Sequence, residues 1–234
     1  AGNDQAAQLA WPAADPRVIS VGAVDKAEQQ VSFSNSGPQL QLSAPGYGVQ
    51  TAWLDGQRAY VDGTSASAPI VAGAIAAVLS QNPALTPLQA AQLLERTAND
   101  AGAPGADPAF GNGILNLGWA MNSGTPGYVD TAVSSHYFDA ANNQMQFVVQ
   151  NRSAQPVSGL TLKITAGNSE SARLVPMLAP GETFVVTWPN ATALTAAAGG
   201  SVRFTTELVN PAGLTDVVPA NNRRASVLTA PPTK

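Results

Sequence analysis

The stretch Gly63-Thr-Ser-Ala-Ser-Ala-Pro69 places a hydroxyl group at the start of a predicted helix. A serine hydroxyl is a poor nucleophile unless a base removes its proton and donors stabilise the developing oxyanion. Ser65 stands in the first turn, where backbone N–H groups lack partners and the helix dipole is positive. Gly63 permits close approach of a second backbone, and Pro69 costs no helical hydrogen bond there. These features fit acyl transfer on Ser65, and they fit a plain strand-to-helix turn equally well.

The elements expected around Ser65 are those of an α/β domain. The mostly β-branched run Val18–Val24 predicts a buried strand. The alternating runs Val31–Ser34 and Leu40–Leu42 predict half-buried strands. Residues 65–81 are small or aliphatic on every side, which predicts a helix that is buried all round.

A second predicted helix has a clear N-terminus. Thr86 is the expected N-cap, Pro87 takes the first helical position, and Gln89 follows three residues after the cap. The apolar stripe of this helix is expected to comprise Leu88, Ala91, Leu93 and Leu94. A short helix is expected around Trp119–Met121.

After Ser123–Gly127 the pattern changes to short alternating runs. They lie at Met145–Val149, Leu160–Ile164, Phe184–Trp188, Val202–Leu208 and Ala225–Leu228. Strands at this spacing, with no helix between them, predict an all-β sandwich of roughly one hundred residues. We therefore expect an α/β part at 1–123, a linker at 124–127, a sandwich at 128–230 and a tail at 231–234.

The composition excludes several classes of function. The 234 residues include no cysteine, so disulfides and thiolate metal sites are excluded. A net charge of -4 argues against nucleic acid or an anionic membrane as partner. The sequence contains no run of eighteen apolar residues, so no membrane span is predicted. A cysteine-free chain rich in small polar residues favours a secreted or surface-exposed bacterial protein. The opening Ala-Gly-Asn-Asp-Gln has neither Met nor a charged leader, so we expect that residue 1 is not the natural start.

The sequence resembles the subtilisin-like serine proteases over residues 1 to about 122. GTSASAPIVAGAIAAVLSQNP, from Gly63, resembles the active-site serine segment of that family. Other motifs of the family follow in its order: AGND at 1–4, WPAADPRVISVGAVD at 11–25, VSFSNSGP at 31–38, LSAPG at 42–46, LTPLQAAQLLERTA at 85–98 and FGNGILNLGWAM at 110–121. The resemblance implies the C-terminal half of a subtilisin-like catalytic domain with a parallel sheet.

The resemblance assigns roles to five residues. Ser65 would be the nucleophile that forms the acyl-enzyme. Asn3 would donate its side-chain amide to the oxyanion, with the backbone N–H of Ser65 as the second donor. Thr64 would support this oxyanion hole, and Ala1 and Gly2 would form one wall of the pocket for the residue before the scissile bond.

Three further residues lie next to these positions in the sequence, and none of them is assigned a catalytic role. Asp4, at the rim of that pocket, could favour basic or polar substrate side chains, although a solvated loop carboxylate is the simpler interpretation. Ala66 stands where many relatives have methionine, so oxidation at that position should not inactivate the protein. Asp62 occupies a position that the family usually fills with a small polar residue, so it is not expected to be the catalytic acid.

The catalytic aspartate and histidine of the family would both precede Asn3 and are absent from this sequence. The single histidine, His136, follows the protease-like part, and we expect it to be a surface or packing residue. Three accounts remain open. The segment with the aspartate and histidine is a separate polypeptide after nicking, or it is a preceding part of a longer chain, or the gene is a remnant that serves as a binding module.

No cofactor is expected to be required, but two cation sites deserve a test. Ala13–Val18 resembles a loop that binds calcium or a monovalent cation through backbone carbonyls in some relatives. Asp216, Asn221 and Asn222 offer oxygen atoms suited to calcium, although asparagines at strand ends are more often turn formers.

Residues from about 128 to 228 resemble the bacterial cell-adhesion-related, immunoglobulin-like modules. The resemblance rests on Val148–Asn151, Leu178–Glu182 and Asp216 with Asn221, Asn222 and Val227. The jelly-roll domain that follows the protease domain in kexin-type enzymes is the nearest alternative. Either module implies stabilisation, surface attachment or substrate positioning rather than chemistry.

The sequence thus predicts part of an extracellular serine endopeptidase that acts on protein or peptide substrates. The N-terminal protease segment that carries the aspartate and histidine is the expected partner. The alternative is a non-catalytic surface-binding or adhesion module derived from a decayed protease.

Overall fold

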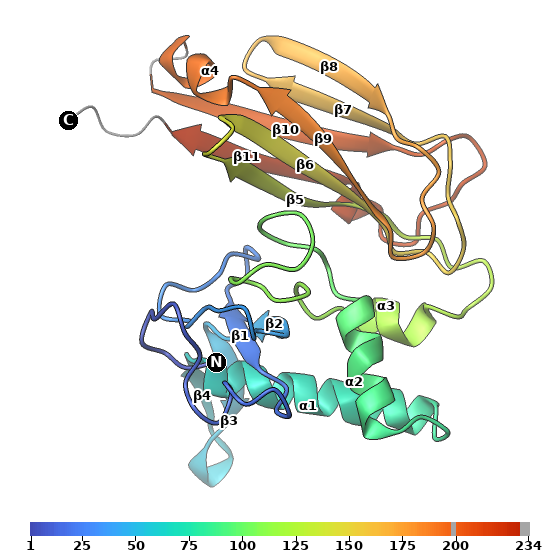
Figure 1. The fold of residues 1–234 in the computed structure, drawn as a ribbon. Coiled ribbons are helices and arrows are strands. Elements are labelled where there is room, and N and C mark those ends of the chain that lie inside the picture. The colour runs from blue at the N-terminus through green and yellow to red at the C-terminus, as the bar shows by residue number, and fades with distance from the viewer. Residues whose placement is uncertain (198–199, 230–234) are drawn as a thin grey trace. The chain divides into compact units, whose positions relative to one another are not determined.

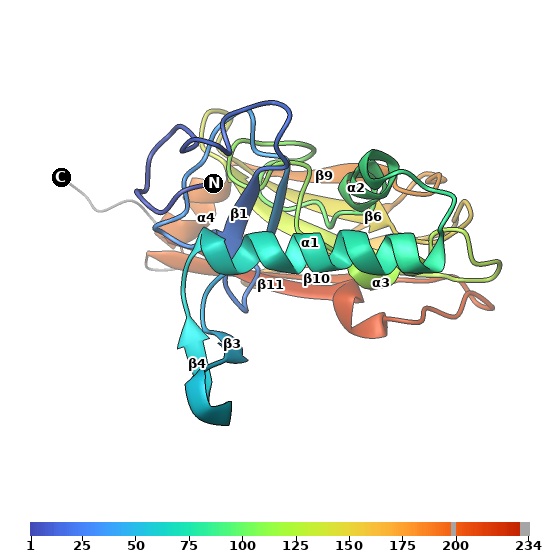
Figure 2. The same ribbon diagram turned by 90° about the horizontal axis from the view of Figure 1, so that it is seen from below.

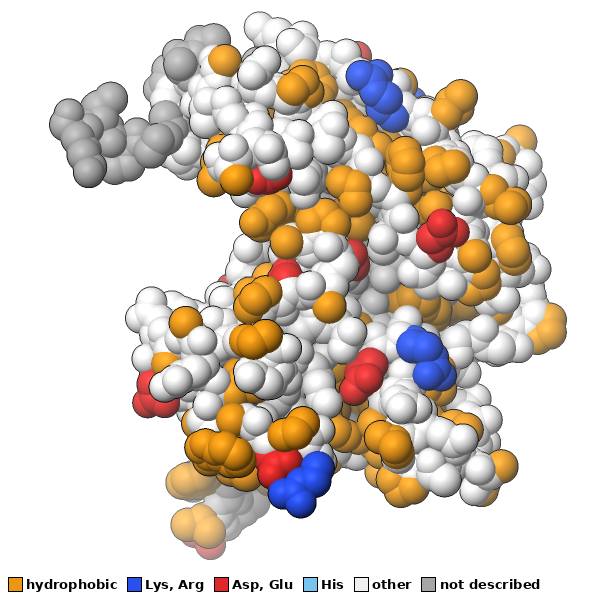
Figure 3. All heavy atoms as spheres, in the orientation of Figure 1, with side chains coloured by type: hydrophobic (Ala, Val, Ile, Leu, Met, Phe, Trp, Pro, Cys, Tyr) orange, Lys and Arg blue, Asp and Glu red, His pale blue; other side chains and the backbone are white. Residues whose placement is uncertain are grey.

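The computed structural model of the protein describes residues 1–197 and 200–229 (Figure 1). The chain forms two compact units. Unit 1 comprises Ala1–Ala101 and Gly105–Met121, and unit 2 comprises Gly102–Pro104 and the residues from Asn122 onward. Residue 230 of the predicted sandwich and the predicted tail at 231–234 lie outside the described residues. Charged side chains are sparse on the face shown in Figure 3, as the 11% content of charged residues leads one to expect.

Unit 1 is built on a pair of parallel strands that a long helix covers. β1 (Val21–Val24) pairs with β2 (Leu42–Pro45), and α1 (Thr64–Gln81) packs on both strands (Figure 2). The core between them is apolar and comprises Val21, Leu42 and Ala44 from the strands and Val71, Ala74 and Val78 from α1. The helical members recur at i, i+3 and i+7, so they form one stripe along α1 that faces the strands.

The opposite face of α1 is exposed, so the prediction of a helix buried all round is wrong. Ala68, Ala72 and Ala76 are exposed at i, i+4 and i+8, and Pro69 and Gly73 are exposed beside them. A Cβ atom placed on Gly73 would meet no atom within 4 Å. Small apolar side chains occupy both faces of α1, and for this reason the sequence does not distinguish the covered face from the open one.

Among the residues that the structure describes, α1 is also the one helix long and apolar enough to cross a membrane, by length and composition alone. A core helix of a folded domain passes the same test. Because α1 packs on β1 and β2 through its buried stripe, its hydropathy has a structural explanation within unit 1.

A hairpin leads from the sheet of unit 1 to the start of α1. β3 (Val49–Ala52) pairs antiparallel with β4 (Arg58–Val61), and the 3₁₀ turn η1 (Leu54–Gly56) joins them. Figure 1 shows the hairpin extending away from β1 and β2. Its large side chains are exposed, with Trp53 at 57%, Leu54 at 73% and Tyr60 at 73%.

α2 (Pro87–Arg96) confirms the predicted N-terminus. The Thr86 hydroxyl accepts a hydrogen bond from the Gln89 backbone N–H, and the Gln89 side chain accepts one from the Thr86 backbone N–H. Leu88 is 66% exposed, so its place in the predicted stripe is wrong. It lies about 110° around the helix from the face that Ala90, Ala91 and Leu94 bury. The short helix predicted around Trp119–Met121 is α3 (Leu117–Asn122).

The predicted strand at Val31–Ser34 is a turn in the structure. The Ser34 N–H donates to the Val31 carbonyl, and the Phe33 carbonyl accepts from the Gln5 N–H. The backbone groups that a strand would need are therefore used for a turn and for the N-terminal loop. The predicted strand at Leu40–Leu42 is also displaced, because regular pairing begins only at Leu42.

Unit 2 consists mainly of two antiparallel sheets. One contains β5 (Thr131–Asp139), β6 (Gln144–Asn151) and β9 (Thr183–Pro189), in the order β5-β6-β9. The other contains β7 (Thr161–Ala166), β8 (Ser169–Leu174), β10 (Ser201–Val209) and β11 (Arg223–Thr229), in the order β11-β10-β7-β8. The unit also contains α4 (Ala191–Ala197) and the 3₁₀ turn η2 (Pro219–Asn222).

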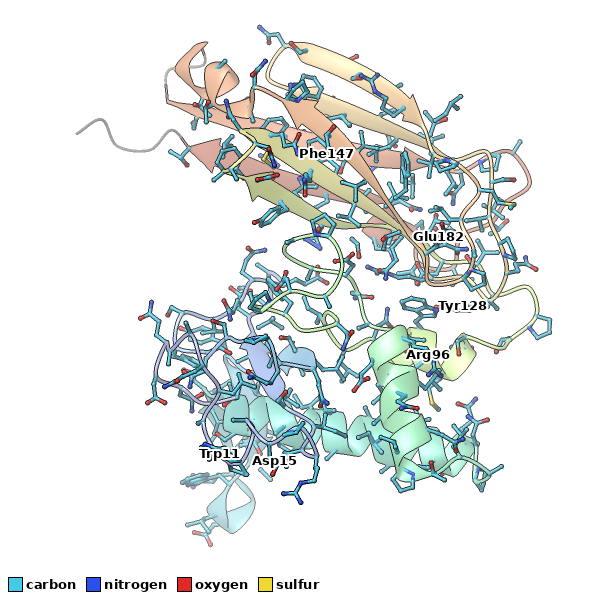
Figure 4. All side chains as sticks on the ribbon, viewed as in Figure 1. Trp11, Asp15, Arg96, Tyr128, Phe147 and Glu182 are labelled. Atoms are coloured by element: carbon cyan, nitrogen blue, oxygen red, sulfur yellow. The ribbon has the colours of Figure 1, made fainter. Side chains whose placement is uncertain are left out.

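Both sheets of unit 2 contribute to one hydrophobic core. Phe147 of β6 lies between the sheets (Figure 4), with its ring centroid 5.7 Å from that of Phe204 of β10. Five predicted strands correspond to β6, β7, β9, β10 and β11, but β5 and β8 were not predicted. β8 is almost wholly exposed and polar, and β5 contains Ser134, Ser135 and His136, so neither shows clear alternation.

Candidate active site around Ser65

The nucleophile candidate Ser65 lies in the first turn of α1, and its side chain is exposed. Its hydroxyl makes no hydrogen bond within the described part of the chain. The helix is preceded by Gly63, whose φ of 146° and ψ of 156° belong to a region that is essentially reserved for glycine. The Gly63 N–H donates to the Gly46 carbonyl over 2.8 Å, so the turn is tied to the end of β2.

Asn3 comes from the opposite end of unit 1 in sequence and is held against the start of α1. Its Oδ1 atom accepts from the Thr64 backbone N–H over 2.9 Å and from the Thr64 hydroxyl over 3.0 Å. Thr64 is 5% exposed, and its Oγ1 atom also accepts from the Gly2 N–H over 3.2 Å. These bonds engage the oxygen of the Asn3 amide and leave the Nδ2 group free to donate elsewhere.

Three donors surround the space that Gly63 leaves open because it has no side chain. A Cβ atom built on Gly63 would lie 2.9 Å from Ser65 Oγ, 3.4 Å from Asn3 Nδ2 and 3.7 Å from the Ser65 backbone nitrogen. A nucleophilic hydroxyl and two N–H-bearing nitrogens therefore lie together on the open side of Gly63. Two N–H groups beside a nucleophilic hydroxyl are the donors that a developing oxyanion requires.

The two residues expected to form a pocket wall are anchored beside this site. The Ala1 nitrogen donates a hydrogen bond to the Val21 carbonyl over 2.9 Å, and the Ala1 carbonyl accepts one from the Ala10 N–H over 2.8 Å. Gly2 has a φ of 114°, and a Cβ atom on it would lie 2.3 Å from Asn35 Nδ2. The wall itself stays a prediction, as does the effect of the exposed Asp4 on specificity.

The remaining ionisable candidates have structural partners. Asp62 Oδ1 accepts from the Gly48 N–H over 2.6 Å, which ties the two ends of the hairpin together. His136 lies on β5, where Thr206 Oγ1 and Ser226 Oγ each lie 2.8 Å from one ring nitrogen. Burial and, to a smaller extent, the positive charge of Arg224 lower the pKa of His136 to about 3. Both ring nitrogens are thus engaged within unit 2, which fits a packing residue.

Both candidate cation sites stay predictions, and their oxygen atoms have hydrogen-bond partners within the chain. Asp216 Oδ2 accepts from the Thr131 hydroxyl and from Asn222 Nδ2, each over 2.8 Å. Asn221 Nδ2 donates to the buried Asp130, whose pKa burial raises. Asp216 thus serves as a hydrogen-bond acceptor within unit 2, and calcium binding there stays a prediction. Within the described ranges, no group of three or more His, Asp or Glu residues could hold a metal ion.

The loop Ala13–Val18 leaves its cation site as a prediction. Asp15, which Figure 4 labels together with Trp11, pairs with Arg17 over 2.6 Å and accepts the Val18 N–H on its carbonyl. The neighbouring Arg17 guanidinium lowers the pKa of this Asp15 carboxyl. No side-chain atom of this loop is buried without a partner, so nothing in the loop points to a bound ion.

Sequence reasoning missed one functional candidate, Asn35. It lies in the VSFSNSGP motif, which was recognised only as a family turn. Its Oδ1 atom accepts from the Asp4 and Ala6 N–H groups, on the loop that carries Asn3. The polarity of Asn35 was visible in the sequence, but its partners lie about thirty residues away and no local pattern identifies them.

An exposed serine hydroxyl beside two N–H donors at a helix N-terminus is an arrangement that serine hydrolases use for acyl transfer. Residues 1–113 match the model of the subtilase family. The chain is 38% identical over 109 residues to a subtilisin of Bacillus pumilus, which covers 47% of this chain and 38% of that protein. It is 37% identical over 120 residues to a thermostable alkaline protease of Halalkalibacterium halodurans, with 51% and 32% covered.

Among solved structures, a lanthipeptide protease is 25% identical to this chain with a TM-score of 0.49, and the match covers 52% of this chain and 48% of that one. The chain spans about a third of the length of the two relatives named above. Residues 1–113 are a subtilase-like domain segment, and their similarity is to serine proteases.

Proposed function

We propose that the protein is part of a subtilisin-type serine endopeptidase that forms its acyl-enzyme on Ser65. The observation that carries this proposal is the clustering of Ser65 Oγ, Asn3 Nδ2 and the Ser65 backbone nitrogen beside Gly63. The similarity of residues 1–113 to subtilases supports the same reaction.

In the proposed reaction Ser65 Oγ attacks the carbonyl carbon of the scissile peptide bond. The hydroxyl proton passes to the imidazole of a histidine, and the carbonyl oxygen becomes the oxyanion that Asn3 Nδ2 and the Ser65 N–H stabilise. The C–N bond then breaks, and the imidazolium gives its proton to the leaving amine. Water hydrolyses the ester by the same route and restores the Ser65 hydroxyl.

The histidine and the aspartate that orients it are proposed to come from a protease segment outside this chain. The sequence contains a single histidine, and His136 already bonds to Thr206 and Ser226 through its two ring nitrogens. The open face of α1 at Ala68, Ala72 and Ala76 supports a partner, because it is an apolar surface on a core helix that nothing in unit 1 covers. The proposed substrate is a protein or peptide, and nucleic acid is not proposed as a partner.

For unit 2 we propose an immunoglobulin-like module with a role in attachment, stabilisation or substrate positioning. Sheets of three and four antiparallel strands that enclose one core support this choice over a jelly roll, which has eight strands. One relative carries the name cell wall-associated protease of Bacillus subtilis, and it supports an extracellular or cell-surface location. A cation in Ala13–Val18 remains a proposal without a structural argument.

Intact mass spectrometry with a fluorophosphonate serine probe tests the proposal. The natural protein should gain one adduct and show a second polypeptide or a longer chain than the present sequence. Ser65→Ala should abolish the adduct, whereas Ser80→Ala, which changes another exposed serine of α1, should not. An adduct on a chain with no additional segment would contradict the proposed source of the base.

The alternative is a non-catalytic binding or adhesion module derived from a decayed protease. A natural protein that takes up no probe at Ser65, with the fold intact, would support this alternative and contradict the endopeptidase.

A further inference from the structure

Asn35 is a buried amide that contacts the loop carrying Asn3 on both sides of that residue. It is 2% exposed. Its Oδ1 atom accepts from the Asp4 N–H over 2.8 Å and from the Ala6 N–H over 3.0 Å, and its own N–H donates to the Gly2 carbonyl over 3.0 Å. One residue therefore fixes the backbone immediately before and immediately after Asn3.

Two further backbone bonds continue this attachment. The Gln5 N–H donates to the Phe33 carbonyl, and the Ser36 N–H donates to the Ala6 carbonyl, each over 2.9 Å. Asn35 differs from these contacts because a single side-chain oxygen holds two N–H groups of the loop. Removing it would leave both donors without their acceptor, which costs more than the loss of an exposed hydrogen bond.

The position of Asn3 is thus set from two directions. Thr64 holds the oxygen of the Asn3 side chain, and Asn35 holds the backbone from which that side chain projects. The distance from Nδ2 to a bound oxygen depends on both attachments. Oxyanion donors act within about 2.7–3.1 Å of the oxygen, and a displacement of about 1 Å can cost about a hundredfold in rate.

We propose that Asn35 is a positioning residue that holds Asn3 in place as an oxyanion donor. The proposal rests on the acyl transfer proposed above for Ser65. Asn35 acts through the loop of residues 2–6, and its oxygen is already engaged by the Asp4 and Ala6 N–H groups. Its loss should therefore reduce the rate of the chemical step and leave ground-state binding of substrate nearly unchanged.

Amide hydrogen exchange tests the attachment in the present chain, without any need for activity. Asn35→Ala should speed exchange of the Asp4 and Ala6 amides about tenfold or more and shift the side-chain amide resonance of Asn3. Asn35→Asp keeps an acceptor in place and should restore protection of both amides. Ser34→Ala is the matched control, because Ser34 is also buried but its hydroxyl accepts from the Ala23 N–H of β1 over 3.1 Å and touches Asn35 only at the main-chain carbonyl, over 3.3 Å. Unchanged exchange in Asn35→Ala would overturn the proposal.

Steady-state kinetics on the complete natural protein test the catalytic consequence. Asn35→Ala should lower kcat about ten- to a hundredfold with KM within about threefold, and Ser34→Ala should leave both near the wild-type values. A fall confined to KM, or an unchanged kcat after the loop amides have lost protection, would overturn the proposal. An inactive wild-type protein would instead refute the endopeptidase, and hydrogen exchange alone would then decide whether Asn35 fixes Asn3.

Discussion

Replacing Gly63 by alanine should lower both the free energy of unfolding and the reactivity of Ser65, and the two effects have different causes. The φ of 146° and ψ of 156° at this position are strained for any residue with a Cβ atom, at a cost of about 1–3 kcal/mol in the free energy of unfolding. The new methyl carbon would lie 2.9 Å from Ser65 Oγ, which is closer than two such atoms normally approach. It would also narrow the space beside Asn3 Nδ2 and the Ser65 backbone nitrogen.

Gly73→Ala in the same chain is a matched control for this change. Gly73 lies in the interior of α1, and a Cβ atom on it would meet nothing within 4 Å. Alanine there should stabilise the helix by about 0.5–1 kcal/mol. The same chemical substitution should therefore change the unfolding free energy with opposite signs at the two positions, and the two variants should differ by about 1.5–4 kcal/mol.

Urea denaturation of the two variants measures this difference, and the rate of fluorophosphonate labelling measures reactivity. Gly63→Ala should label at least about a hundredfold more slowly in the complete protein, because the methyl group crowds the Ser65 hydroxyl and the two proposed oxyanion donors. Gly73→Ala is a control for stability alone, because Gly73 lies beside the face of α1 that is proposed to bind the partner segment. A Gly63→Ala variant with wild-type stability and wild-type labelling would refute the assigned backbone geometry and the proposed oxyanion position together.

Two other outcomes follow from single contacts. His136 has a pKa of about 3 in the folded chain, below the ordinary value of 6.5, so the unfolded chain binds the extra proton first. The unfolding free energy should be highest above pH 6.5 and fall by up to about 1.4 kcal/mol per pH unit from 6.5 towards 3. Urea titrations at pH 7, 6 and 5 should show this slope in the wild-type chain and its loss in His136→Gln. Thr86→Ala should cost about 1 kcal/mol because the Gln89 N–H loses its cap, whereas Thr86→Ser should keep most of that stability in the same denaturation assay.

The sequence predicted best those features that depend on neighbouring residues. Thr86, Pro87 and Gln89 identify the start of α2, since a capping box involves only one turn of chain. The unpredicted strands show the opposite case. β8 is held by pairing with β7, with Ser169 opposite Ala166, and its own residues are exposed and polar. Its strand conformation is therefore decided by a partner and not by its own pattern.

The residues of the candidate site were identified through the family resemblance, because their contacts are distant in sequence. Asn3 and Thr64 are 61 residues apart, and no local rule joins a loop asparagine to the first turn of a distant helix. The motifs supplied that pairing, but they gave no role to Asn35, because a buried amide in a turn does not reveal which backbone groups it will bind. The exposed side of α1 escaped prediction because alanine and glycine pack against a core as readily as they face solvent.

Because one side of α1 is open, the unfolding free energy of unit 1 should depend on the concentration of any molecule that binds there. Any surface that covers Ala68, Ala72 and Ala76 binds only the folded helix, since the unfolded chain does not bring these residues to one side. At a hundred times its dissociation constant such a surface would add about 2.7 kcal/mol. The melting temperature of unit 1 would then rise with the concentration of the covering molecule. Unit 2, whose core lies between its own two sheets, would melt independently of that concentration.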